Sequence, residues 1–266
     1  MRADTDRAEG ATAWAIAPGA LRRLAPVFVA GLFAGLAGGL GARVVMRLSA
    51  LASPEAVHGF QTEAGATIGE ITREGTLFLV VAIGIASALV GTAFYLTVRA
   101  WLPTRRWARA AAFGGLELVV FGTIVLDAGN RDFTIVSHPV LNVALFCGLF
   151  VGHGMLQVLW QRPCRRLVAA VGGGVRWREV LVDVATIAAL GLTLLAALAS
   201  GLRSGDLLSR VVVAVLLTCA VGLATIRPER ASRLTRRVLR AVGAVALTLL
   251  ALSGTLELLD AVTTIA

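Results

Sequence analysis

The sequence predicts an all-α fold, a polytopic bundle of membrane-spanning helices, on three observations. Hydrophobic residues make up 57% of the 266-residue chain and charged residues only 15%, whereas soluble domains are about 45–50% apolar. The apolar residues gather in seven runs of 16 to 23 residues, and the segments between the runs carry almost all of the arginines. Alternation of polar and apolar residues, which a membrane barrel requires, is absent.

Each of the seven runs is long enough for one membrane-spanning helix. The hydrocarbon of a bilayer is roughly 30 Å thick, and a helix of about 20 residues crosses it with every backbone N–H bonded inside the helix. We therefore predict a single integral membrane domain over residues 1–266. The predicted spans are 26–46, 77–98, 110–126, 139–160, 180–202, 211–226 and 241–262.

The arginines predict the orientation of these spans. All 25 basic residues are arginine, and the eight segments that flank the spans hold 4, 3, 4, 1, 5, 2, 6 and 0 of them. Because short arginine-rich loops stay in the cytoplasm, we expect the N-terminus inside and the C-terminus outside. A cleaved signal peptide that ends near Gly41 is the alternative, and Arg43 and Arg47 directly after the cleavage site disfavour it.

Composition also excludes several functions. Without any lysine, the chain cannot form a retinal or pyridoxal Schiff base or a P-loop, so we expect no cofactor. The net charge of +9 lies beside apolar spans, which favours membrane topology over nucleic-acid binding. Cys147, Cys164 and Cys219 form no CxxC pair and are typical of small apolar fillers. No GxSxG motif or mid-span aspartate pair occurs, so we predict no enzyme.

Glycines recur at intervals of four in two spans. Gly31, Gly35 and Gly39 share one face of the first span, and Gly148 and Gly152 repeat the interval in the fourth. Such faces let another backbone approach closely. We favour ordinary packing within the chain, and the alternative is a seam with a membrane-protein partner or a second copy.

The fourth span carries a polar stripe on one face. Asn142, Phe146, Leu149, His153 and Gln157 follow at steps of four, three, four and four residues. Since polar groups that face lipid are costly, we expect this stripe to point into the bundle.

Glu117 is the mid-span charge of the third span. It lies seven residues from the inner end of its span at Ala110, and His153 lies seven residues from the inner end of the fourth span at Trp160. A carboxylate at mid-membrane costs roughly 2.5–3.5 kcal/mol unless it is paired, protonated or hydrated. We therefore predict a contact between Glu117 and His153, either as a proton relay or as a hydrogen bond that holds two helices together.

The first outer loop is predicted to be an acidic helix. Ser53-Pro54-Glu55 is typical of a capped helix start, and Glu63, Thr67, Glu70 and Glu74 would then share a face. With Asp127 and Asp132 of the second outer loop, and with His58 and His138, these acids form a candidate vestibule. No HxxE or HExxH spacing occurs, so we predict no metal site.

Two inner segments stand out. Arg227–Arg240 holds six arginines and an apolar stripe of Ala231, Leu234 and Val238. This pattern fits a surface helix that contacts anionic lipid headgroups, with a plain topogenic loop as the alternative. Gly172-Gly173-Gly174 is predicted to be a hinge, since it lacks the spacing of a phosphate loop.

Several short motifs in the first four spans resemble a group of multi-pass membrane proteins of actinobacteria. They are Gly69-Glu70-Ile71-Thr72, Gly75-Thr76, Trp101-Leu102-Pro103, Arg131-Asp132-Phe133 and Pro139-Val140-Leu141. The resemblance covers about residues 25–160 and implies a bacterial plasma membrane and a shared architecture, but no activity.

Two functions follow from the sequence. One is a binding or accessory membrane protein without turnover, which uses the glycine faces and the outer acidic loop. The other is a small proton- or ion-coupled carrier that uses Glu117, His153 and the stripe of the fourth span.

Overall fold

The computed structural model describes residues 18–62, 67–70, 72–127, 129–130, 132–135, 138–171, 207–225 and 233–265. Over these residues the chain is helical, apart from loops and one antiparallel bridge between Gln61 and Thr67. Five helices are long and apolar enough to cross a membrane. The predicted all-α class is therefore confirmed for the described part of the chain.

Ten helical segments matter for the argument, and the second candidate span is built from three of them. A π-helical turn, η2, joins α3 to α4 in one continuous helix. The bounds are α2 (Pro18–Ala52), α3 (Arg73–Leu77), η2 (Phe78–Ile83), α4 (Gly84–Val98), α5 (Arg106–Phe121), η3 (Gly122–Ile124), α6 (Asp132–Ile135), α7 (Pro139–Val171), α9 (Leu207–Thr225) and α10 (Arg233–Ile265).

Predicted spans one, two, three, four and seven correspond to the five long apolar helices. Most of these helices extend past the predicted limits, because helix formation continues beyond the apolar run into the polar flanks. The fifth predicted span, 180–202, lies outside the described residues. The sixth corresponds to α9, whose apolar part, Val211–Val221, is shorter than a full span.

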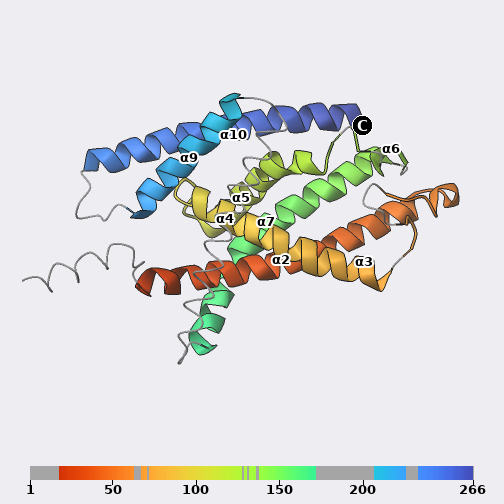
Figure 1. Ribbon diagram of the computed structural model, residues 1–266, viewed down its shortest axis with the longest axis horizontal. Helices are drawn as coiled ribbons and strands as arrows, with labels where there is room; N and C mark the ends of the chain where they lie inside the picture. Colours follow the sequence, from red (N-terminus) through yellow and green to blue (C-terminus); the bar gives the residue numbers. More distant parts are fainter. Residues whose placement is uncertain are drawn as a thin grey trace, which may run out of the picture.

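The helices form layers between α2 and α10, which lie on opposite sides of the bundle with α5 and α7 between them (Figure 1). α2 packs against both α4 and α7, α5 packs against α7 and α10, and α9 packs against α10. We call the end that the arginine pattern assigns to the cytoplasm the inner end.

Contacts between helices give their relative directions. Gly31 of α2 faces Thr92 whereas Gly39 faces Leu79, so α2 is antiparallel to the helix that contains η2 and α4. α2 is also antiparallel to α7, because Gly38 faces His153 and Gly41 faces Leu149. The helix that contains η2 and α4 therefore runs in the same direction as α7.

The main apolar core closes the inner half of the bundle. Phe113 of α5 lies between Phe94 and Tyr95 of α4, with ring centroids 5.7 and 5.1 Å away. Val212 of α9 and Ala246 of α10 complete this cluster. Tight packing at the inner end leaves the outer half, between η2 and α7, as the place where the structure can hold a site.

Candidate functional site in the outer half of the bundle

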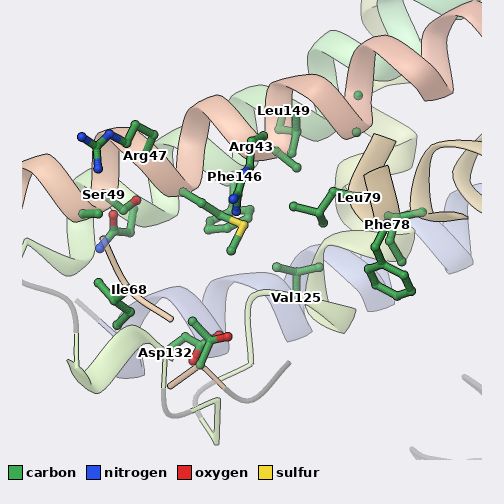
Figure 2. Close-up of a pocket in the computed structure, with 18 of the residues that line it drawn as sticks. Arg43, Arg47, Ser49, Ile68, Phe78, Leu79, Val125, Asp132, Phe146 and Leu149 are labelled. Atoms are coloured by element: carbon green, nitrogen blue, oxygen red, sulfur yellow. The ribbon is translucent and has the colours of Figure 1, made fainter. Parts of the chain in front are cut away.

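A cavity of about 450 Å³ lies between α2, η2 and the outer half of α7. At the outer end it is lined by Thr62, residues 67–70, Val125, Asn130, Asp132 and Phe133. Figure 2 shows side chains from these elements that converge on one space. The lining is mainly apolar and includes Met46, Ile68, Phe78, Leu79, Val125, Phe133, Phe146, Leu149 and Phe150.

The cavity exists because α4 and α7 touch closely only on its inner side. There Gln157 Nε2 donates to Thr92 Oγ1 at 3.2 Å, and Gly91 lies against the His153 ring. Farther out, Leu79 and Leu149 both line the cavity. The π-helical turn at η2 forms this part of the wall, and π turns inside α-helices are frequent at functional sites.

His153 lies on the inner wall of the cavity and contacts Glu117 behind it. Nδ1 of His153 is 2.8 Å from Oε2 of Glu117, and only 2% of Glu117 is exposed. The structure thus contains the contact that the depths of the two residues predict. The contact joins α5 to α7. These helices are antiparallel, since Arg106 near the start of α5 donates to the carbonyl oxygen of Leu159, whereas Glu117 farther along α5 contacts the earlier residue His153.

Glycines shape the space around this pair. A Cβ at Gly91 would lie 2.8 Å from Glu117 Oε1, and a Cβ at Gly154 would lie 2.7 Å from Glu117 Oε2. Real Cβ atoms do not approach so closely, so both positions need glycine for the carboxylate to keep its place. Glu117 Oε1 and His153 Nε2 are buried and have no hydrogen-bond partner in the described structure.

Polar contacts continue from the pair toward the inner end. After the Gln157 bond to Thr92, Tyr95 OH donates to Gln161 Oε1 at 3.2 Å. These groups are enclosed, and Gln157 is 0% exposed. α7 is therefore packed around Gln157, whereas its outer half lines the cavity; nearer its inner end Trp160 and Leu167 are exposed.

The predicted stripe of α7 does point into the bundle, as its polar character requires. Asn142 is 1% exposed and Gln157 is 0% exposed. The structure adds a division that the sequence did not predict. Asn142, Phe146, Leu149 and His153 line the cavity, and Gln157 does not.

Arg43 and Arg47 were counted in the sequence only as outer charges, yet both lie inside α2 and line the cavity. Arg43 Nη2 donates to the carbonyl oxygen of Glu70 at 3.4 Å, and Arg47 Nη1 donates to that of Gly69 at 3.1 Å. A signal was available, because the four-residue interval of Gly31, Gly35 and Gly39 continues at Arg43 and Arg47.

The predicted acidic helix of the first outer loop is wrong. Among its described residues, helix is confined to a 3-10 turn, Glu55–Val57, and to α3, which holds Glu74, and the bridge of Gln61 and Thr67 lies between them. Gly59 and Gly69 both have φ near +90°, a conformation that favours glycine and ends helices.

The 3-10 turn has Pro54 as its N-cap, and Ser53 Oγ donates to the carbonyl oxygen of Ser49 at 2.9 Å. The acids of the two outer loops lie in different elements. Glu70 and Asp132 line the cavity, Glu74 is exposed in α3 and Asp127 is exposed in its own loop, and Glu63 lies outside the described residues.

The glycine face of α2 packs inside the chain, as favoured. A Cβ at Gly31, Gly35 or Gly39 would collide with Thr92, Gly84 or Leu79. Gly148 and Gly152 behave differently, since an added Cβ at either would meet no described atom within 4 Å. Gly148 and Gly152 therefore pack against no described helix, because they lie on a face of α7 away from α2 and α5.

The predicted basic surface helix is, in its described part, the start of the last long helix. α10 runs without a break from Arg233 through the predicted seventh span to Ile265. Residues 226–232 and the predicted hinge at residues 172–174 lie outside the described residues. In comparisons with protein-family models, curated proteins and solved structures, nothing matches the chain.

Proposed function

We propose that the chain is a multi-pass protein of the bacterial plasma membrane that binds a ligand in the cavity between α2, η2 and α7, without chemical turnover. The observation that carries this proposal is the cavity itself. Its volume of about 450 Å³ lies in the range of small-molecule sites, roughly 300–1,000 Å³. The cavity also opens to the surface at η2, where Phe78 and Ile83 of its lining are exposed, so a ligand can enter it.

The proposed topology has seven spans, with the N-terminus inside. Its structural support is the direction of α10, which runs parallel to α5, because Val119 faces Gly254 and Gly122 faces Leu258. Since α7 is antiparallel to α5, the chain between α7 and α10 must return to the inner end. Two crossings between them, at 180–202 and 211–226, agree with this direction. The arginines at the start of α10 favour contact with anionic lipid headgroups.

Thiol labelling tests the cavity. Single cysteines at Leu149 and Gln157, in a variant without the three native cysteines, would be exposed to a small water-soluble thiol reagent in membranes. We expect Leu149→Cys to react at least tenfold faster than Gln157→Cys, because the first side chain lines the cavity and the second is enclosed. Equal and negligible reaction at both positions would overturn the binding function.

A second candidate is a proton-coupled carrier, and the buried pair favours it. Glu117 holds a carboxylate inside the bundle with one oxygen lacking a hydrogen-bond donor, and its partner His153 reaches the cavity wall. A proton that moves between them would connect the cavity to the polar contacts of the inner half.

The variant Glu117→Gln separates the two candidates. It keeps the shape of the side chain but cannot exchange a proton, so a carrier would lose pH-dependent uptake while the protein still inserts. Proteoliposomes with an imposed pH gradient give the measurement, and His153→Gln serves as the partner variant. A pH profile identical to that of the wild-type protein would eliminate the relay and leave the binding function standing.

A further inference from the structure

We infer that the cavity holds a single-chain anionic amphiphile from the outer leaflet, whose phosphate or carboxylate group binds Arg43 and Arg47 and whose hydrocarbon chain lies along η2 and α7. This inference rests on the proposed binding function and names its ligand class. Three features of the lining support it: most of its side chains are apolar, it contains two arginines, and it reaches the lipid-facing surface.

The apolar part of the lining fits a hydrocarbon chain. Side chains of α2, η2 and α7 supply most of the wall, with Leu79 and Phe146 facing one another across it in Figure 2. Burying a hydrocarbon against such a wall is favourable in proportion to its area. A strongly polar solute would find few partners there.

The arginines supply the polar end of the site. Arg43 points from α2 toward the middle of the cavity, close to Phe146 (Figure 2). Its guanidinium can donate five hydrogen bonds, but the described structure gives it one long bond to a main-chain oxygen, and its Nε is buried without an acceptor. A phosphate or carboxylate accepts two parallel bonds from such a fork.

Arg43 and Arg47 have no described carboxylate within ion-pair distance. Both bind main-chain carbonyl oxygens, and neither forms an ion pair with a described carboxylate, since the ion pair found among those residues is that of Glu117 and His153. Glu70 and Asp132 also line the outer end of the cavity, and Glu70 is exposed. Arginines inside membrane-spanning helices are rare, face the interior or a cavity, and often mark a functional site.

The wall of the cavity also reaches the lipid-facing surface. Phe78 and Ile83 belong to the lining and are 59% and 43% exposed. A chain from the surrounding leaflet can therefore meet the cavity at η2 without passing through the packed inner half. This contact favours a lipid over a free anion from solution.

Photolabelling in nanodiscs tests the ligand class. The full-length protein in phosphatidylcholine nanodiscs would be exposed to hexadecyl phosphate that carries a diazirine near the chain end, and to the matching diazirine hexadecanol. We expect the phosphate to label α7 around Phe146 and Leu149 at least tenfold more strongly than the alcohol. Excess inorganic phosphate should not displace it, because the chain supplies much of the affinity.

Variants of the arginines and of the wall complete the test. Arg43→Gln should lower labelling by about tenfold, while Arg73→Gln, which removes an exposed arginine at the start of α3, should not change it. Leu149→Trp should fill the cavity and abolish labelling, and Leu141→Trp on the exposed face of α7 is its control. These two variants keep the inference testable if Arg43→Gln does not fold.

Each outcome has a distinct meaning. Equal labelling by alcohol and phosphate, or unchanged labelling in Arg43→Gln, overturns the anionic amphiphile and leaves the binding cavity, provided that Leu149→Cys still reacts with the thiol reagent. Displacement by inorganic phosphate alone overturns the lipid and points to a free anion. Absence of both photolabelling and thiol reaction overturns the inference together with the binding function.

Discussion

Glu117 and His153 form a buried pair whose members depend on each other. Glu117 has 2% of its surface exposed, and among the described residues its carboxylate is bonded to His153 through Oε2, while Oε1 has no partner. Removing one member of such a pair leaves an uncompensated polar or charged group in a low-dielectric environment. Removing both members avoids that cost.

A double-mutant cycle at this pair should therefore be strongly non-additive. We expect His153→Leu alone to destabilise the protein by about 3–5 kcal/mol, as is typical when a buried pair loses one member. The double variant Glu117→Leu/His153→Leu should lie closer to the wild type than His153→Leu alone. The measurement is reversible unfolding of the purified protein in mixed micelles, and additive effects of the two changes would contradict the pairing.

One face of α2, with residues spaced four apart, both packs against a neighbouring helix and lines the cavity. At Gly31, Gly35 and Gly39 it packs directly on the backbone of α4 and η2. At Arg43 and Arg47 the same interval continues along the cavity. The glycines therefore mark the part of this face that packs against another helix, and the arginines mark the part that lines the cavity.

The packed seam can be tested with alanine. Gly35→Ala would drive a methyl group onto the carbonyl oxygen of Gly84, and such overpacking typically costs about 1–3 kcal/mol. Gly148→Ala is the matched control, because a Cβ there meets no described atom within 4 Å and alanine favours helix by roughly 1 kcal/mol over glycine.

In thermal unfolding in detergent, we expect Gly35→Ala to have a lower Tm than the wild-type protein. Gly148→Ala should have the same Tm as the wild type or a higher one. A loss of stability at Gly148→Ala equal to that at Gly35→Ala would show that the face of Gly148 is also packed, against a second copy or a partner.

At the scale of the whole molecule, the bundle is asymmetric along its length. Aromatic and aliphatic side chains fill the inner half around Phe94 and Phe113, whereas the outer half holds the cavity. The directions of α5, α7 and α10 also require the chain to begin α10 at the same end at which α7 finishes. Seven spans with an exported C-terminal end satisfy this requirement.

Impermeant labelling of spheroplasts tests the topology. We expect single cysteines at Glu55, which is exposed in the first outer loop, and at Ile265 to react with a membrane-impermeant maleimide, and a cysteine at Thr104 to react only after permeabilisation. All three positions lie at helix ends or in loops, so the reagent can reach them. Reaction of Thr104→Cys in intact spheroplasts would reverse the orientation, and protection of Ile265→Cys would exclude seven spans.

Several features of the site could be predicted from local sequence. Equal depth placed Glu117 opposite His153, and helical spacing placed Asn142 and Gln157 on the inward face. Other features could not. Glycines at positive φ in the first outer loop break a pattern that otherwise resembles a helix, and whether a small-residue face is packed, as at Gly35, or open, as at Gly148, depends on which helix lies opposite.

The sequence by itself determined the all-α class, the approximate places of the long apolar helices and the inward direction of the polar residues, because the cost of polar groups in hydrocarbon acts on each helix separately. Only the tertiary structure decided where the space lies. α4 and α7 meet at Thr92 and Gln157 but leave a cavity farther out, and this places Arg43 and His153 on one wall. Such a convergence depends on contacts between helices, which no single helix encodes.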